Sequence, residues 1–324
     1  MNEIKRVLVV GARRKRQGTG PFVARAFKQA GAEICGIVGT SENSIDEALD
    51  ILSSEHDVNC PGYESLGKAL EEQNPDILAI CSPYEFHLEA LNTAASQGIH
   101  CLCEKPLWWD EAADRKFEVT AKLIKAFQEN GRLLETITQW PHTLETFYTI
   151  YPEEKEKPVT QFEFDLSPAK QSADMLQNSA PHLLSMLYAL AGVGKIKRPE
   201  ISILGGQIDH WQLTFLYEAA QTEIKTSFNL IPAPKPPRPA GYAINGKRVE
   251  RKIHLPEYSF SFEFDDTLYP LADPLDMLVG SFLKKVYIKR SLDSEGLLSG
   301  MKGLITLDES LKTRIRSLLE AIGN

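Results

Sequence analysis

Short apolar runs alternate with amphipathic helical patterns over the first 138 residues of the chain. Apolar runs bounded by polar or turn residues are typical of buried parallel strands, and apolar residues spaced three to four apart indicate helices. The pattern predicts strands at residues 4–10, 33–38, 57–59, 76–80, 99–103 and 133–138. Helices are expected between them, so this half of the chain has the pattern of an α/β protein with a doubly wound parallel sheet.

The pattern changes after residue 138, where strands follow one another without intervening helices. Alternating apolar and polar residues predict strands at 159–166, 201–208, 211–217, 223–230 and 258–264. Asn245-Gly246, between two short alternating runs, is a strong hairpin signal. We therefore expect a dinucleotide-binding (Rossmann) domain at 1–138 and an α+β domain with a largely antiparallel, open sheet at 139–324.

The charge balance limits the classes of partner. The 324 residues include 36 basic and 44 acidic side chains, a net charge of −8, which disfavours a general nucleic-acid or anionic-membrane surface. No apolar run approaches the roughly 20 residues of a membrane span, and the N-terminus lacks the features of a secretory signal. The five cysteines are interpreted as buried hydrophobic residues in a reducing, cytoplasmic protein, and we expect no metal site.

A glycine-rich turn follows the first strand. Gly11 ends that strand, a basic run from Arg13 to Arg16 follows, and Gly18, Thr19 and Gly20 precede the first helix. Glycines let the backbone approach a pyrophosphate, and the free N–H groups and dipole of a helix N-terminus attract it. The spacing is not G-x-G-x-x-G, and many α/β turns carry glycine for steric reasons alone. We take this turn as the candidate cofactor loop.

The end of the second strand bears on the choice of cofactor. Folds that prefer NAD place a carboxylate there for the ribose 2′-hydroxyl, whereas those that accept NADP supply hydroxyls and an arginine. Thr40 and Ser41 are neutral at this point, and the Arg13–Arg16 run is expected within reach. The sequence favours NADP(H), with NAD(H) possible. In the alternative, the basic run is a solvated loop and Glu42 binds the ribose.

Two further motifs follow the strands at 76–80 and 99–103. Ser82, Pro83 and His87 come after the first, and Glu104-Lys105-Pro106 comes after the second. Parallel strands place their carboxyl ends at one edge of the sheet, which is where open α/β sheets bind ligands. We therefore expect these residues beside the glycine-rich turn, in contact with the cofactor.

In this order, S-P-x-x-x-H, Gly98-x-His100 and E-K-P resemble the signature of the Gfo/Idh/MocA oxidoreductases, a resemblance that continues at 270–310. It implies hydride transfer to or from a sugar, a sugar nucleotide or a related keto compound, with Lys105 near the nicotinamide and the reacting oxygen. It also implies that the open sheet of the second domain pairs with another subunit. We expect a homodimer or homotetramer and an apolar exposed sheet face.

The helix expected at 174–191 resembles the D-x-x-x-H-x-x-D helix of the same family. The resemblance makes His182 the second acid/base group, but Asn178 stands where the family has an aspartate and Ser185 replaces its second acid. An amide can orient an imidazole but cannot stabilise an imidazolium by charge. Asp174 is about 12 Å away along a continuous helix, too far to replace the aspartate directly.

Trp108 and Trp109 follow the E-K-P motif and are expected to line the mouth of the cleft, where they could stack on a substrate. Packing between the domains is the alternative for at least one of them. Two other functions stay open beside the oxidoreductase. The first is a dinucleotide-binding sensor or scaffold with an incomplete site, suggested by Asn178. The second is a module that binds another phosphate through the Arg13–Arg16 run, which leaves Lys105 unexplained.

Overall fold

The computed structural model describes residues 3–13, 19–169, 174–203, 210–255 and 258–322. The chain forms two compact units, the first from residues 1–139 and 274–297 and the second from residues 140–273 and 298–324. Each unit contains one β-sheet.

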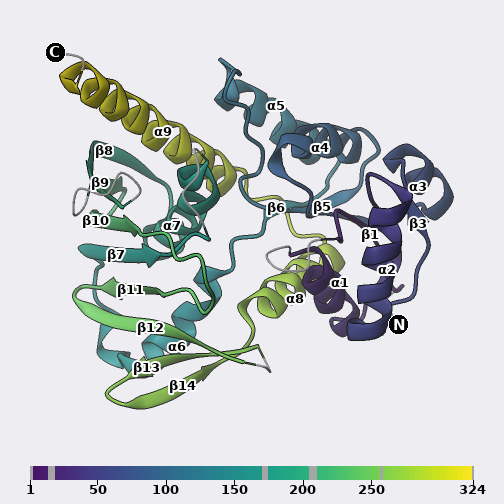
Figure 1. The fold of residues 1–324 in the computed structure, drawn as a ribbon, viewed down its shortest axis with the longest axis horizontal. Coiled ribbons are helices and arrows are strands. Elements are labelled where there is room, and N and C mark those ends of the chain that lie inside the picture. Colours follow the sequence, from purple (N-terminus) through teal and green to yellow (C-terminus); the bar gives the residue numbers. More distant parts are fainter. Residues whose placement is uncertain (1–2, 14–18, 170–173, 204–209, 256–257, 323–324) are drawn as a thin grey trace. The chain divides into compact units, whose positions relative to one another are not determined.

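The first unit contains a parallel sheet whose strand order is β3-β2-β1-β4-β5-β6 (Figure 1). Its strands are β1 Arg6–Val10, β2 Glu33–Val38, β3 Gly62–Tyr63, β4 Ile77–Ile80, β5 His100–Cys103 and β6 Leu134–Thr136. Its helices are α1 Gly20–Gln29, α2 Glu42–His56, α3 Leu66–Gln73, α4 His87–Ser96, α5 Lys116–Glu129 and α8 Pro274–Tyr287. The change of direction from β1 to β4 is the point at which such sheets bind ligands. The predicted doubly wound sheet is confirmed.

The third strand is displaced from its expected position. Residues 57–59 form no strand, because Asp57 ends α2 in the left-handed conformation with φ 51°. The pairing with β2 is made instead by Gly62 and Tyr63. An extended-looking tripeptide after a helix can serve as a helix cap, and only the tertiary pairing distinguishes the two structures.

The sequence analysis placed all of 139–324 in the second domain, but α8 packs with the first unit. Its Phe282 ring lies 6.2 Å from the Phe27 ring of α1, edge to face, and its Asp276 accepts a hydrogen bond from Arg25 at 2.7 Å. The apolar face of α8 joins the core formed by β1, α1 and β2. Burial of this face accounts for the return of the chain to the first unit.

The second unit contains a sheet whose order is β14-β13-β12-β11-β7-β10-β9-β8. All its pairings are antiparallel except that of β7 with β10. The strands are β7 Gln161–Leu166, β8 Gly194–Ile203, β9 Trp211–Ala219, β10 Glu223–Leu230, β11 Ala240–Ile244, β12 Lys247–His254, β13 Ser259–Phe264 and β14 Thr267–Leu271. The hairpin at Asn245-Gly246 joins β11 to β12 with both residues at positive φ, as predicted.

One face of this sheet is covered and aromatic. Trp140 packs edge to face on Phe164 of β7 at 5.0 Å between ring centroids, and Phe147 lies 5.5 Å from Tyr242 of β11. Trp140 and Phe147 belong to the segment that carries α6 Leu144–Ile150. The helices α7 Met175–Ala191 and α9 Ser294–Ile322 complete the unit. Alternation along the strands places the aromatic side chains on this face and polar ones on the other.

The other face of the sheet is polar, which corrects the expectation of an apolar exposed face. Asn229 of β10 donates to Asp165 of β7 at 2.6 Å and accepts from Gln212 of β9 at 3.0 Å. Arg248 of β12 donates to the second oxygen of Asp165. It reaches across β11 where Gly241, the register partner of Asp165, has no side chain. Hydrogen bonds between neighbouring strands thus give these polar side chains partners within one chain.

His100, at the start of β5, makes the stability of the first unit depend on pH. It is 9% exposed, and its Nδ1 accepts the backbone N–H of Leu133 at 2.9 Å. Burial, with the nearby Arg132 and Lys5 cations, lowers the pKa of the ring to about 4 from its ordinary value of 6.5. The unfolded chain therefore binds a proton at a higher pH than the folded chain does.

We predict that the free energy of unfolding falls as the pH drops from 6.5 to 4, because only the unfolded state gains the His100 proton in that window. The upper limit is about 3 kcal/mol, reduced by solvent screening of the partly exposed ring. Denaturant titrations across this range measure it. His100→Asn keeps an acceptor for Leu133 but does not titrate, so its profile should be flatter. Parallel profiles for the two proteins would contradict the assignment.

Candidate functional site

The two described glycines of the turn lie where a side chain cannot fit. Gly11 has φ +89°, and a Cβ there would lie 2.6 Å from the backbone nitrogen of Ser82, just after β4. A Cβ on Gly20 would lie 2.6 Å from the carbonyl oxygen of Gly11. The turn after β1, the start of α1 and the end of β4 thus meet at backbone contact. Gly18 and residues 14–17, which include the basic Arg14, Lys15 and Arg16, lie outside the described residues.

The start of α1 leaves backbone donors for an anion. Thr19 is the N-cap, but its side chain makes no capping hydrogen bond, and Pro21 follows at the start of the helix. The first N–H groups of a helix have no intrahelical partner, and the helix dipole adds positive potential there. With Gly11 and Gly20 keeping this end free of side chains, the turn has the properties of a pyrophosphate cradle.

Glu104 connects this turn to Lys105. The Thr19 hydroxyl donates to Glu104 Oε2 at 2.6 Å. The other carboxylate oxygen accepts the Lys105 backbone N–H at 3.0 Å and lies 3.4 Å from Lys105 Nζ. The Glu104 and Lys105 side chains are 13% and 22% exposed, so solvent only partly screens this pair. The contacts fix the ammonium group beside the candidate cofactor turn, at the carboxyl edge of the sheet.

His87 holds two loops of this edge together. The ring is fully buried; Nε2 faces the carbonyl oxygen of Ser82 at 2.8 Å, and Nδ1 faces those of Pro106 and Leu107 at 3.0 and 3.2 Å. Both nitrogens are therefore engaged by backbone groups, which corrects the expectation that His87 touches the cofactor. It supports the loops that carry Ser82, Pro83 and Pro106.

Arg13 and the end of β2 are brought together through α2. Arg13 Nε donates to Glu47 of α2 at 2.8 Å, on the protein surface. Ser41 is the N-cap of α2, where its hydroxyl accepts the Ser44 N–H at 3.3 Å. The structure thus anchors Arg13 to the helix that follows Thr40 and Ser41. The Ser41 hydroxyl has a structural partner already.

Trp108 and Trp109 pack inside the first unit, which corrects their expected role in substrate stacking. Each is 2% exposed. The Trp108 indole N–H donates to Thr120 of α5 at 2.8 Å, and that of Trp109 donates to Glu111 at 2.8 Å. The Lys116 ammonium lies 4.9 Å from the Trp109 ring centroid. Buried indoles with satisfied N–H groups indicate a packing role against α5.

The remaining candidates lie on α7 in the second unit. Asn178 donates to the Asp174 carboxylate at 2.6 Å, one helical turn before it, and Ser185 donates to the carbonyl oxygen of His182 at 2.8 Å. His182 is partly buried. The Asp174 charge is therefore coupled to Asn178 by a short hydrogen bond, a contact that the sequence analysis did not foresee. The spacing of four residues on a helix was the signal for it.

The described residues contain no group of three or more His, Cys, Asp or Glu side chains that could hold a metal ion. The cysteines of the sheet, Cys81, Cys101 and Cys103, are buried, and burial raises the pKa of each thiol. A protonated thiol is a poor nucleophile. Lys105, with Glu104 beside it, is the chemically useful group that the first unit brings to the sheet edge. None of the described helices is long and apolar enough to cross a membrane.

Comparison with known protein families gives one match. Residues 5–137 match the Gfo/Idh/MocA model, described as an oxidoreductase family with an NAD-binding Rossmann fold. The match covers the six-stranded sheet with the glycine turn and the E-K-P motif. A comparison with curated protein sequences found no significant match.

Solved structures match nearly the whole chain at low sequence identity. The UDP-N-acetylglucosamine 3-dehydrogenase of Acidithiobacillus ferrooxidans is 17% identical, with a TM-score of 0.68 over 95% of this chain and 98% of that one. The scyllo-inositol dehydrogenase of Lactobacillus casei, solved with NAD(H) and scyllo-inositol, is 13% identical, with a TM-score of 0.69 over 96% and 98%.

A dehydrogenase of Thermus thermophilus, solved with NAD and UDP-GlcNAcA, is 15% identical, with a TM-score of 0.64 over 94% and 95%. At these identities the likeness establishes the fold of both units.

We predict that Thr19→Val lowers the free energy of unfolding by about 1.5–3 kcal/mol, the usual contribution of a hydrogen bond to a charged group. The bond lost is that to Glu104. Thr19→Ser keeps the hydroxyl and should stay near wild type. Urea titrations of the three proteins measure the difference. No loss for valine, or a loss for serine as large as that for valine, would contradict a specific contribution of the Glu104 bond.

Proposed function

We propose that this chain, whose residues 5–137 match the Gfo/Idh/MocA oxidoreductase model, transfers a hydride between a nicotinamide dinucleotide and a carbonyl or alcohol carbon of a sugar, sugar nucleotide or related small molecule. The observation that carries the proposal is the Thr19–Glu104–Lys105 chain of contacts. It joins the phosphate-binding end of α1 to the one ammonium group that the E-K-P motif supplies.

Different residues of the first unit would contact different parts of the dinucleotide. Gly11, Thr19 and Gly20 form the turn that would hold the pyrophosphate, and Ser82, Pro83 and Pro106 lie on the loops that His87 ties together. A bound dinucleotide supplies or accepts the hydride at its nicotinamide. The chain's own contribution is to position that ring and to exclude side chains from the turn.

Lys105 is proposed as the group that acts on the reacting oxygen. Its ammonium can polarise a substrate carbonyl or donate a proton to the oxygen as the hydride arrives, and Glu104 holds it in place. By the family resemblance, His182 is the second acid/base and Asn178 orients it. Asn178 adds no charge, and its amide is bonded to Asp174. We propose reduction of a carbonyl or imine alongside oxidation of an alcohol.

NADP(H) is the cofactor we propose as preferred, with NAD(H) as the alternative. The support is the absence of a carboxylate among Gly39, Thr40 and Ser41, together with Arg13, which Glu47 anchors beside α2. Arg13 would have to exchange Glu47 for a 2′-phosphate, or bind both. Glu42, the first residue of α2, is the candidate ribose ligand if NAD(H) is preferred.

A non-catalytic dinucleotide sensor is the second candidate function, and Asn178 is the observation that favours it. Such a protein would keep the turn, Glu104 and Lys105 for binding, without the charge that the family places next to His182. The two functions differ in turnover and not in cofactor affinity.

We also propose a homo-oligomer formed through the second sheet and a cytoplasmic location, the latter supported by five free cysteines.

We predict that Lys105→Ala reduces turnover a hundredfold to ten-thousandfold, the usual range for a general acid or base, while dinucleotide affinity changes little. Screening keto-sugars by nicotinamide absorbance first identifies a substrate, and stopped-flow assays then compare the variant. Lys122→Ala, on the exposed surface of α5, is the matched control and should keep full activity. Undiminished biological activity of the Lys105→Ala protein would favour the sensor.

We predict that Arg13→Ala weakens NADPH binding at least about tenfold, because one charge-assisted hydrogen bond contributes 1.5–3 kcal/mol. NADH binding should be unchanged, since that cofactor lacks the 2′-phosphate. Calorimetric titration of each cofactor into both proteins measures the ratio. Glu47→Gln, which releases Arg13, should strengthen NADPH binding. Equal effects of Arg13→Ala on both cofactors would contradict the proposed phosphate contact.

A further inference from the structure

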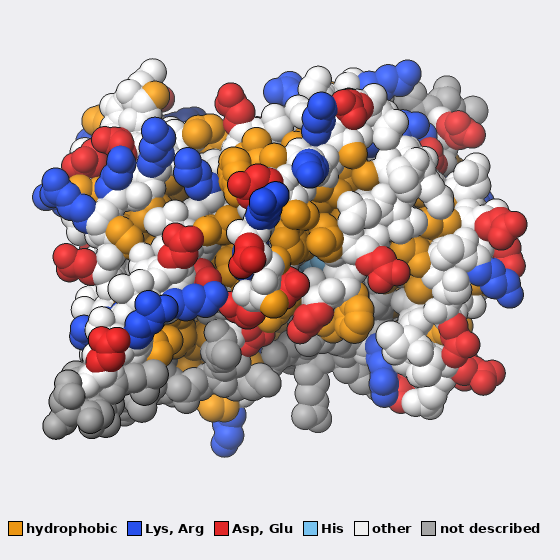
Figure 2. Space-filling view, turned by 90° about the horizontal axis from the view of Figure 1, so that it is seen from above, with side chains coloured by type: hydrophobic (Ala, Val, Ile, Leu, Met, Phe, Trp, Pro, Cys, Tyr) orange, Lys and Arg blue, Asp and Glu red, His pale blue; other side chains and the backbone are white. Residues whose placement is uncertain are grey.

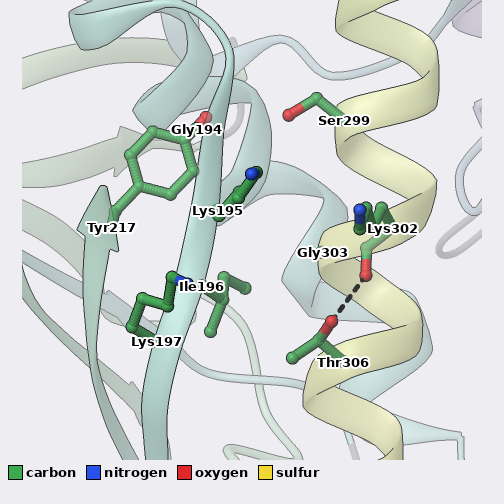
Figure 3. Close-up of a pocket in the computed structure, with 9 residues that line it drawn as sticks. All are labelled: Gly194, Lys195, Ile196, Lys197, Tyr217, Ser299, Lys302, Gly303 and Thr306. Carbon is green, nitrogen blue, oxygen red and sulfur yellow. Dashed lines mark hydrogen bonds between the residues drawn. The ribbon is translucent and has the colours of Figure 1, made fainter. Parts of the chain in front are cut away.

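A cavity of about 270 Å³, open to solvent, lies in the second unit between the edge strand β8 and helix α9, and its three lining lysines, Lys195, Lys197 and Lys302, are exposed. Four positions of α9 line it at helical spacing: Ser299, Lys302, Gly303 and Thr306. Figure 3 shows the Ser299 hydroxyl directed from α9 into the gap, with β8 on the opposite side. Gly303 allows α9 to approach, because a Cβ there would lie 2.7 Å from Leu184 of α7. The cavity is therefore formed by the packing of one unit.

All the charged side chains that line this cavity are positive. Lys195 and Lys197 from β8 and Lys302 from α9 line it, and no Asp or Glu is among its lining residues. Lys197 lies 3.7 Å from Glu218 on the neighbouring strand, where both side chains are about half exposed. Among the described residues, Lys195 and Lys302 have no ion-pair partner. In Figure 2, Lys and Arg side chains at the left, the end that carries the C-terminal part of α9, are interspersed with Asp and Glu side chains.

The polar groups between the lysines are uncharged hydroxyls. Tyr217 donates to the carbonyl oxygen of Gly192 at 2.8 Å, and burial raises the pKa of its phenol. The ring lies directly on β8, since a Cβ on Gly194 would lie 2.4 Å from it. The Thr306 hydroxyl donates to the Lys302 carbonyl oxygen at 2.9 Å. No negative group of the cavity offsets the ammonium charges.

The kind of donor selects the kind of anion. Planar carboxylates are typically recognised by the fixed fork of arginine, whereas lysine binds phosphate as a mobile point charge. Ammonium groups from both sides of a small cavity, with hydroxyls between them, suit a compact tetrahedral dianion. The volume equals that of several waters at about 30 Å³ each, enough for phosphate and a small attached group.

We propose that the cavity between β8 and α9 is a binding site for a phosphate group, held by Lys195 and Lys302 with Ser299 as a hydroxyl donor. The site is contained in the second unit and shares no residue with the glycine turn or with Lys105. Its ligand is either inorganic phosphate or the phosphate of a small phosphate ester. It stands independently of the proposed hydride transfer.

The test is calorimetric titration of the full-length protein with inorganic phosphate and, separately, with glucose 6-phosphate and glucose, all at constant ionic strength. Saturable binding of a phosphate ligand by the wild-type protein is expected. Tighter binding of the ester would identify an esterified ligand, equal or tighter binding of inorganic phosphate would identify the free ion, and glucose should not bind. Lys195→Ala/Lys302→Ala should weaken binding at least about tenfold, because each charge-assisted hydrogen bond contributes 1.5–3 kcal/mol.

Two further variants keep the test decisive. Ser299→Asp places a carboxylate in the cavity and should abolish phosphate binding. Lys122→Ala/Lys284→Ala removes the same charge from exposed positions of the first unit and should bind like wild type. The proposal is overturned if the wild-type protein shows no saturable binding, if the cavity variants bind as well as wild type, or if the control pair weakens binding equally. Circular dichroism and urea titration confirm that each variant is folded.

Discussion

The backbone contact between Gly11 and Ser82 is the constraint on which the rest of the first unit depends. The parallel strands β1 and β4 end side by side there, and a single added Cβ would lie 2.6 Å from the Ser82 nitrogen. This contact lies at the change of direction of the sheet, and with Gly20 it keeps the start of α1 free of side chains. Glu104 then joins that helix end to Lys105. The candidate anion-binding turn and the Lys105 ammonium group are thus parts of one local structure.

The sequence predicted those features that local pattern determines. Periodicity and turn chemistry predicted the bounds of β2, the parallel arrangement of the strands in the first sheet and the Asn245-Gly246 hairpin. The association of α8 with the first unit could not be predicted in this way, since an amphipathic helix does not specify which core its apolar face joins. The position of β3 likewise depends on pairing with β2 and not on its own two residues.

The structure brings the motif residues to one edge of the sheet as expected, but several of them have partners that the sequence did not predict. The motif placed Ser82, His87 and Glu104 at one edge, but a motif does not say which side chains face a ligand. Both ring nitrogens of His87 face backbone carbonyl oxygens, and Trp108 donates to Thr120, because buried polar groups must find partners and the nearest were in the protein. The Thr19–Glu104 bond spans 85 residues of sequence, and no local pattern indicates it.

The central claim is that the edge of the first sheet binds a nicotinamide dinucleotide through the Gly11 turn. Calorimetric titration of the wild-type protein and of Gly11→Ala with NADPH and NADH tests it most directly. The account predicts one dinucleotide bound per wild-type chain and loss of that binding in Gly11→Ala, with circular dichroism showing that the variant is folded. Failure of the wild-type protein to bind either dinucleotide, or undiminished binding by folded Gly11→Ala, would contradict it.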